Sequence, residues 1–130
     1  MIIGIDVGGS TTKIVGMEKG CICHPMFVTA ADPVTSLFGA FGKYIYDHSI
    51  QLSDVEQVML TGVGSSYIQQ PLYGLPTART DEFIANGLSA QYATGLDKLM
   101  VVSMGTGTSF VRVENETIRH VGGIGIGGGT

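Results

Sequence analysis

The first third of the chain shows a strand-type pattern followed by a helix-type pattern. Apolar residues run or alternate through residues 1–7, 12–17 and 21–29, and the turn residues Glu18, Lys19 and Gly20 separate the last two segments. Asp32 followed by Pro33 is typical of a helix start, and apolar residues at positions 34, 37, 38, 41 and 45 keep helical spacing to about residue 48. We therefore predict a three-stranded antiparallel meander followed by a helix.

The rest of the chain alternates between the two patterns. Residues 56–61 predict a strand, and a loop rich in Ser, Pro and Gly extends to about residue 79. A second helix is expected with Thr80 as its N-cap and Asp81 and Glu82 in its acidic first turn. Residues 99–104 predict another strand, and 110–113 with 117–121 predict a hairpin through the turn at 114–116.

The resulting order, βββαβαβ and then a hairpin, predicts an α/β fold with a mixed sheet and flanking helices. It resembles one half of the ribonuclease H-like fold of actin, the sugar kinases and Hsp70, in which ATP lies in a cleft between two such halves. The resemblance implies that residues 1–97 form an N-terminal actin-like ATPase half and that 98–130 start a second half. Because the last residues read GGGT without a strand or helix to anchor them, we expect the chain to be an N-terminal fragment of a longer protein.

Composition narrows the function classes. The chain has 130 residues, of which 44% are hydrophobic, and a formal net charge of −4, so we expect neither nucleic acid nor a membrane as a partner. It lacks both a run of about 20 apolar residues and the cationic leader of a signal peptide. Cys21 and Cys23 lie too close together for an ordinary disulfide framework, which favours a reduced, cytoplasmic protein, and with His24 they offer too few ligands for a metal cluster.

Two loops rich in glycine and hydroxyl residues each follow a strand-type segment. They read DVGGSTTK at 6–13 and SMGTGTS at 103–109. Glycine lets backbone N–H groups approach an anion closely, and Ser and Thr hydroxyls add further donors. Asp6 can hold a hydrated Mg²⁺, and Lys13 can neutralise phosphate charge. The two loops therefore predict a phosphate-binding protein.

Other phosphate motifs are weaker or missing. Gly123, Gly125 and Gly128 satisfy G-x-G-x-x-G. A dinucleotide site also requires a helix directly after the glycines and an acidic residue about 20 positions later, and this sequence offers neither. The sequence contains no Walker A motif. His24, His48 and Cys21 show no spacing typical of a nucleophile and its base.

Four segments taken together resemble the type II (eukaryotic-like) pantothenate kinases. They are DVGGSTTK, DEF at 81–83, SMGTGTS and HVGGIGIGGGT at 120–130, in that order along the whole chain. The resemblance implies ATP- and Mg²⁺-dependent phosphorylation of pantothenate to 4′-phosphopantothenate, the first step of coenzyme A biosynthesis. It also implies that ATP is bound by these residues: Asp6, Gly8, Gly9, Ser10, Thr11, Thr12, Lys13, Gly105, Thr106, Gly107, Thr108, Gly127, Gly128 and Gly129.

The same resemblance assigns the catalytic carboxylate to Glu82. A helix N-terminus favours a negative charge, and an ionised carboxylate is the form that can accept a proton. A weak base suffices because the loose transition state of phosphoryl transfer needs little nucleophilic push. The alternative is that Glu82 only complements the helix dipole, as acidic residues in first turns usually do.

Pantothenate carries a carboxylate, so its site is expected to supply a cation or a strong donor. The family tends to place an arginine directly before the valine of VGG, where this chain has His120, with Arg119 one position earlier. Neighbouring strand residues face opposite ways, so either His120 replaces the arginine or a local kink restores Arg119. Ser109 is the other expected substrate contact. A solvated strand charge at Arg119 and a structural serine at Ser109 are the plain alternatives.

The resemblance further implies a homodimer when the protein is full length, with coenzyme A or acyl-CoA as an inhibitor. Two functions of other classes stay open. One is a partner-coupled ATPase of the same fold, like the activators of acyl-CoA dehydratases, although the cysteines at 21 and 23 do not supply the cluster ligands that those need. The other is a non-catalytic module that senses a nucleotide or coenzyme A.

Overall fold

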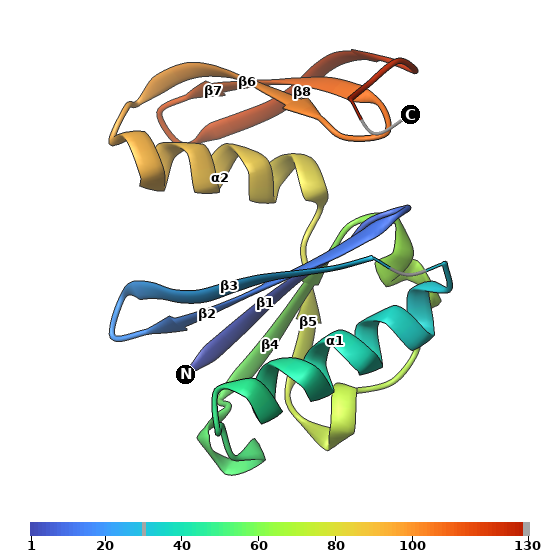
Figure 1. Cartoon of the computed structure of the whole chain (residues 1–130). Coiled ribbons are helices and arrows are strands. Elements are labelled where there is room, and N and C mark those ends of the chain that lie inside the picture. The colour runs from blue at the N-terminus through green and yellow to red at the C-terminus, as the bar shows by residue number, and fades with distance from the viewer. Residues whose placement is uncertain (30, 129–130) are drawn as a thin grey trace. The chain divides into compact units, whose positions relative to one another are not determined.

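A computed structural model describes residues 1–29 and 31–128 of the chain. Contacts between residues divide the chain into two compact units, Met1–Thr80 and Asp81–Thr130 (Figure 1). These units group residues by packing alone. The division between two fold halves at residue 97, after the second helix, therefore stays a prediction.

The first unit contains a five-stranded mixed sheet in the order β3-β2-β1-β4-β5. The antiparallel meander of β1 (Ile2–Val7), β2 (Thr11–Glu18) and β3 (Cys21–Thr29) confirms the three predicted strands. The predicted strand β4 (Gln57–Thr61) pairs in parallel with β1, and β5 (Thr77–Arg79) pairs in parallel with β4.

The segment predicted as a loop up to residue 79 contains more structure than expected. Strand β5 was not predicted, because three residues are too few to show a period of two. Two short 3-10 helices, η2 (Val63–Tyr67) and η3 (Leu72–Gly74), precede it, and a third, η1 (Leu52–Asp54), lies before β4. These pieces return the chain to the amino end of β4, where β5 begins its parallel pairing.

Helix α1 (Pro33–Asp47) packs against one face of this sheet. Its N-cap is Asp32, as predicted, and the Asp32 carboxylate accepts a hydrogen bond of 2.7 Å from the Thr35 amide. Hydrogen bonding with Thr35 lowers the pKa of Asp32 below its ordinary value. The charged cap satisfies an amide that the helix itself leaves unpaired.

The core lies between α1 and the sheet. Its fully buried members come from β1, β2, β4, α1 and the segments around them: Ile3, Ile5, Val7, Ile14, Leu37, Phe41, Tyr44, Val58, Leu60 and Leu72. The Tyr44 hydroxyl donates to the Cys23 carbonyl oxygen at 3.2 Å, and burial raises the pKa of that phenol. In β1, the buried residues Ile3, Ile5 and Val7 face α1. Because side chains alternate along a strand, Gly4 and Asp6 lie on the opposite face of the sheet.

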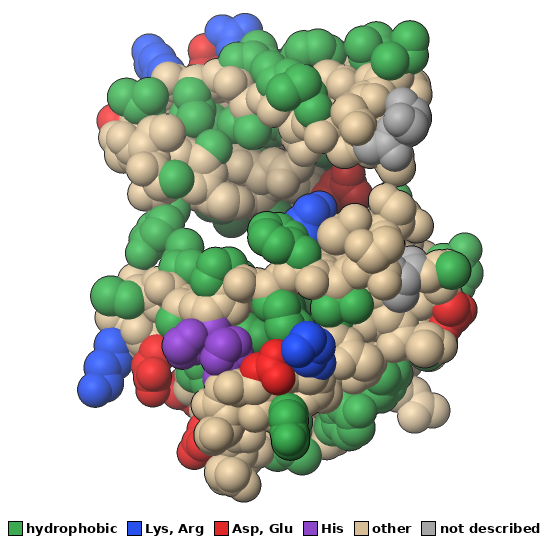
Figure 2. Space-filling view, viewed as in Figure 1, with side chains coloured by type: hydrophobic (Ala, Val, Ile, Leu, Met, Phe, Trp, Pro, Cys, Tyr) green, Lys and Arg blue, Asp and Glu red, His purple; other side chains and the backbone are tan. Residues whose placement is uncertain are grey.

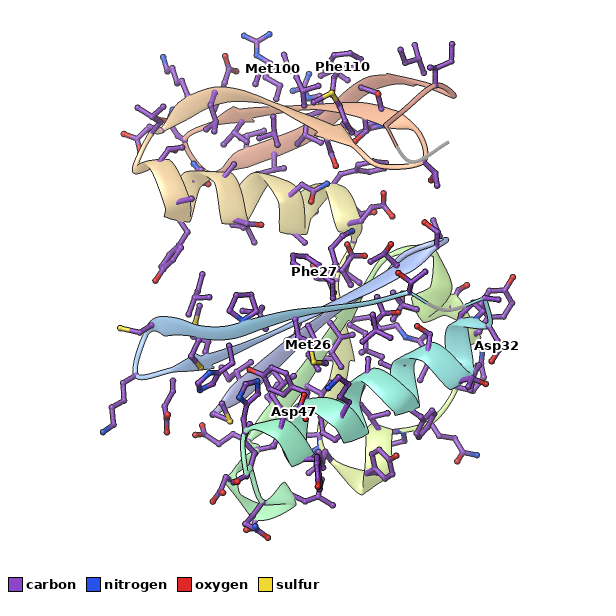
Figure 3. All side chains as sticks on the ribbon, in the orientation of Figure 1. Met26, Phe27, Asp32, Asp47, Met100 and Phe110 are labelled. Atoms are coloured by element: carbon purple, nitrogen blue, oxygen red, sulfur yellow. The ribbon has the colours of Figure 1, made fainter. Side chains whose placement is uncertain are left out.

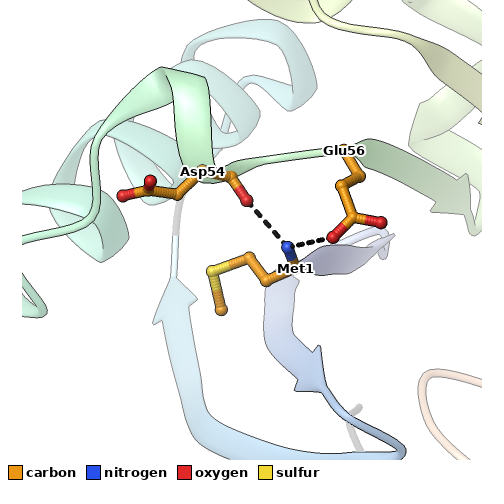
Figure 4. Close-up of polar contacts among 3 residues, drawn as sticks. All are labelled: Met1, Asp54 and Glu56. Carbon is orange, nitrogen blue, oxygen red and sulfur yellow. Dashed lines mark hydrogen bonds and ion pairs between the residues drawn. The ribbon is translucent and has the colours of Figure 1, made fainter.

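The amino group of Met1 holds the start of β1 beside β4 through two hydrogen bonds. It donates to the Asp54 carbonyl oxygen at 2.7 Å and to the Glu56 carboxylate at 2.9 Å (Figure 4). These contacts support the parallel register in which Ile2 lies opposite Gln57. The same register places Asp6 opposite Thr61 at the carboxyl ends of the two strands.

The sheet face opposite α1 carries exposed apolar side chains. On β3, Met26 points toward α1 and packs against the core, whereas its neighbour Phe27 points the other way and is 70% exposed (Figure 3). Ile2 and Met17 are also exposed. Figure 2 shows that hydrophobic side chains also reach the surface at several places on the side of the molecule in view.

The second unit is a three-stranded antiparallel sheet covered on one face by α2 (Glu82–Thr94). Its strands are β6 (Lys98–Met104), β7 (Thr108–Glu114) and β8 (Thr117–Ile124), and they confirm the predicted strand and hairpin. Val111 and Val113 are buried between sheet and helix. Met100 and Phe110 lie on the opposite face (Figure 3).

The start of α2 differs from the prediction by one residue. Its N-cap is Asp81 rather than Thr80, because the Asp81 carboxylate accepts from the amides of Phe83 and Ile84 at 2.8 and 3.1 Å. Glu82 is therefore the first residue inside the helix. At the other end Gly95 caps the helix in the left-handed conformation.

In the part of the chain that the structure describes, neither helix combines the length and the apolar character needed to cross a bilayer.

Candidate functional site

The first glycine-hydroxyl loop is the tight turn between β1 and β2. The Gly8 amide donates to the Thr11 carbonyl oxygen at 3.0 Å, which leaves Gly9 and Ser10 at the tip. A Cβ on Gly8 would lie 2.6 Å from that same oxygen, so only glycine fits there. The backbone of this turn is therefore open to a ligand, as a phosphate loop requires.

Asp6 and Lys13 lie opposite each other beside this turn, on the sheet face that points away from α1. The Lys13 ammonium and the Asp6 carboxylate form an ion pair of 3.0 Å, with side-chain exposures of 52% and 37%. An exposed pair of this kind is worth no more than about 1 kcal/mol. A phosphate group can therefore compete for Lys13 at little cost.

Thr12 is placed differently from the other residues of this loop. Its side chain is 1% exposed, and its hydroxyl hydrogen-bonds with the Ser36 hydroxyl of α1 at 2.7 Å. The strand alternation turns it to the α1 face, opposite Asp6 and Lys13. The structure therefore does not bring the Thr12 side chain together with the other predicted ATP contacts.

In the second unit, two glycine-rich segments pack against each other. The Gly105 amide donates to the Gly107 carbonyl oxygen at 2.8 Å, and the Thr108 hydroxyl donates to the Ile126 carbonyl oxygen at 2.8 Å. A Cβ on Gly127 would lie 2.4 Å from the Gly105 carbonyl oxygen. Residues 105–108 and 126–127, separated in sequence, thus form one continuous backbone surface.

Gly128, next in the chain, is exposed, and the predicted ATP contact at Gly129 lies outside the described residues. Thr106 is exposed at the tip between Gly105 and Gly107. The tip of the second loop therefore presents the Thr106 hydroxyl, a donor of the kind that a phosphate group uses.

His120 lies on the α2 side of the second sheet and Arg119 does not. The His120 ring stacks on Phe83 of α2, with ring centroids 3.9 Å apart and planes inclined by 9°. Arg119 pairs with Arg112 across the strands and shares the opposite face with Glu114 and Thr117. The bulge in β8 falls after His120, so it does not turn Arg119 toward α2.

Ser109 and Glu82 lie on the same side of this sheet as His120. Ser109 is two residues before the buried Val111 on β7, so the two side chains share the α2 face. A Cβ on Gly123 would lie 3.7 Å from Ser109 Cα and 3.8 Å from His120 Nε2, so both residues border this glycine. Glu82 directly precedes Phe83, the residue on which His120 stacks.

Comparison with known proteins agrees with these features. A type II pantothenate kinase of Bacillus cereus (strain G9842) is 32% identical over 135 residues, which cover 98% of this chain and 46% of that protein. The chain is thus similar in sequence to type II pantothenate kinases over nearly all of its own length. It spans about half the length of the curated relatives it matches. No protein-family model matches the chain.

Solved structures confirm the actin-like ATPase fold that the order of strands and helices predicts. Component A of the (R)-2-hydroxyglutaryl-CoA dehydratase of Acidaminococcus fermentans superimposes with a TM-score of 0.75 at 19% identity, covering 90% of this chain and 44% of the other. The activator of the 2-hydroxyisocaproyl-CoA dehydratase of Clostridium difficile, solved with bound ADPNP, gives a TM-score of 0.72 at 15% identity, covering 92% and 45%. At these identities the similarity concerns the fold alone.

Sequence reasoning did not single out Gly62, which closely approaches Asp6. A Cβ on Gly62 would lie 2.4 Å from Asp6 Oδ1 and 2.5 Å from the Val7 carbonyl oxygen, and its φ is +89°. The carboxylate of Asp6 therefore lies directly over the glycine that follows β4. A glycine directly after a strand, as in LTG at 60–62, is the only signal that the sequence offers for this contact.

Proposed function

We propose that this protein takes part in the ATP-dependent phosphorylation of pantothenate. The observation that carries the proposal is the 32% identity to a type II pantothenate kinase over 98% of the chain. The glycine-rich loops, the carboxylate at the start of α2 and the histidine stacked on the next residue, Phe83, add support from geometry. The dehydratase activator with bound ADPNP supports a nucleotide as the ligand of this fold.

In this proposal the residues of the first unit neutralise the negative charge of the nucleotide phosphates. Asp6 would hold Mg²⁺, which when bound neutralises phosphate charge. Among the described residues no three His, Cys, Asp or Glu side chains come together as a metal cluster. A single carboxylate nevertheless fits, because Mg²⁺ in kinases is usually held by one or two carboxylates together with substrate phosphates and water. Lys13 leaves Asp6 for a phosphate oxygen.

The second unit contributes the groups that act on pantothenate. Glu82 accepts the proton of the pantothenate hydroxyl as the oxygen attacks the γ-phosphorus of ATP. His120 donates an N–H to the pantothenate carboxylate, and Ser109 adds a hydroxyl on the same side. The amides of Thr106 and Gly107 face phosphate oxygens, and the hydroxyl of Thr106 adds a donor beside the γ-phosphate.

The proposal is tested with the protein expressed from its whole reading frame. Incubation with MgATP and pantothenate is expected to yield ADP and 4′-phosphopantothenate in equal amounts, measured by mass spectrometry. The control omits pantothenate. ADP formation that does not depend on pantothenate would instead support the partner-coupled ATPase, and nucleotide binding without any turnover would support the sensing module.

Replacing His120 by alanine is expected to raise the KM for pantothenate by about 10- to 100-fold, the worth of a hydrogen bond to a charged group. The matched variant is Arg119→Ala, which removes a larger charge from the opposite sheet face and is expected to change this KM less than threefold. Steady-state kinetics with pantothenate varied at saturating ATP measures both. A larger effect from Arg119 would assign the substrate contact to the arginine.

Homodimer formation, inhibition by coenzyme A or acyl-CoA and a cytoplasmic location stay predictions from the resemblance and the composition.

A further inference from the structure

The hydroxyl of Thr61, the last residue of β4, is buried without a hydrogen-bond partner. Among the described residues, it is the only buried side-chain nitrogen or oxygen without a hydrogen-bond partner. Thr12, for comparison, shares a hydrogen bond of 2.7 Å with Ser36. An unpaired buried hydroxyl is unfavourable, and a valine of nearly the same shape would avoid that cost. The position therefore calls for an explanation other than packing.

The place of Thr61 in the sheet suggests that explanation. Asp6 is its register neighbour on the parallel strand β1, and in-register residues of parallel strands point to the same face. That face is the one opposite α1, because Val58 and Leu60 of β4 are buried against the helix. The next residue is Gly62, over which the Asp6 carboxylate lies. The unpaired donor thus lies at the same strand ends as the carboxylate.

Among the described residues, Lys13 is the side chain that donates to the Asp6 carboxylate. The 3.0 Å contact joins Lys13 Nζ to Asp6 Oδ2. A bound phosphate group attracts the ammonium, and Asp6 then needs a new donor to keep its orientation. Thr61, its register neighbour on β4, has a hydroxyl whose proton is not used in the fold.

We propose that Thr61 is a positioning residue for the nucleotide–magnesium site at Asp6. When phosphate draws Lys13 away, the Thr61 hydroxyl donates a hydrogen bond to the Asp6 carboxylate and holds it toward the hydrated cation. The inference rests on the proposed function, because it takes a nucleotide with Mg²⁺ as the ligand of this surface. It adds a residue that lies outside both glycine-hydroxyl loops.

The decisive variant is Thr61→Val in the protein expressed from its whole reading frame. Without ligand, its melting temperature is expected to equal or exceed that of the wild type, since no hydrogen bond is lost. The affinity for ATP in the presence of Mg²⁺ is expected to fall about tenfold, as a lost hydrogen bond to a charged group would cause. The affinity for ATP in excess EDTA is expected to change less than twofold. Calorimetric titration measures both affinities.

Thr12→Val is the matched control for stability. It removes a paired hydroxyl and leaves Ser36 without its partner, so its melting temperature is expected to fall. A lowered melting temperature for Thr61→Val would show that its hydroxyl is paired in the fold, and an unchanged affinity for MgATP would show that it does not serve the ligand. Either result overturns the inference, as does an equal loss of affinity with and without Mg²⁺.

Failure of this inference is distinguishable from failure of the proposed function. If the wild type phosphorylates pantothenate while Thr61→Val binds MgATP normally, only the role of Thr61 is wrong. If the wild type binds MgATP and the variant shows the expected loss, but pantothenate is not phosphorylated, the role of Thr61 holds and the substrate is wrong.

Discussion

Replacing Glu82 by glutamine is expected to lower kcat for pantothenate phosphorylation by about 10²- to 10⁴-fold, the range that a general base contributes. The amide keeps the size and shape of the carboxylate but cannot accept the proton of the attacking hydroxyl. Glu82 is the first residue inside α2, where the positive end of the helix favours the negative charge that a base needs. The KM for ATP is expected to change less than threefold, because nucleotide binding is assigned to the glycine-rich loops.

The neighbouring carboxylate provides the control for this variant. Asp81 caps α2 by accepting from the amides of Phe83 and Ile84, and asparagine caps a helix about as well as aspartate does. Asp81→Asn is therefore expected to keep kcat within about threefold of the wild type. Stopped assays of phosphopantothenate, with calorimetric titration of ATP, measure both variants. Undiminished turnover in Glu82→Gln would exclude Glu82 as the base and leave it a complement to the helix dipole.

Much of the fold could be predicted because local signals agreed with the final packing. Alternating apolar residues in 1–29 became the meander, and the Asp32-Pro33 pair began α1. Strand β5 could not be predicted, since its three residues are held by parallel pairing with β4 rather than by a pattern of their own. The cap of α2 was misplaced by one residue because Thr80 and Asp81 are both good N-caps, and only the hydrogen bonds decide between them.

The two loops of the candidate site could be predicted from the sequence, but the directions of several of their side chains could not. Glycine content identified both loops, but whether Thr12 points to the ligand or to the core depends on which face of β2 is covered by α1. The choice between Arg119 and His120 likewise depends on the register of β8 against β7. The contact of Gly62 with Asp6 joins two strands that are more than 50 residues apart in the sequence, so no local pattern records it.

Replacing Gly62 by alanine is expected to destabilise the protein by about 2–6 kcal/mol. About 1–3 kcal/mol comes from the backbone, whose φ of +89° and ψ of 162° lie in a region that only glycine occupies readily. A further 1–3 kcal/mol or so comes from crowding, since the new Cβ would meet both the Asp6 carboxylate and the Val7 carbonyl oxygen. Natural domains are stable by only about 5–15 kcal/mol, so this single methyl group is a large perturbation.

Gly74→Ala is a control for a positive φ without crowding. Gly74 also has a positive φ, of +74°, but a Cβ there would meet no atom within 4 Å. Its variant is therefore expected to lose a backbone contribution alone, and Gly62→Ala is expected to lose more because it adds the crowding against Asp6 and Val7. Urea unfolding at equal protein concentration gives both free energies. Equal losses in the two variants would contradict the contact between Gly62 and Asp6, whereas a larger loss in Gly62→Ala, with weaker binding of MgATP, is the result expected if this glycine shapes the site around the carboxylate.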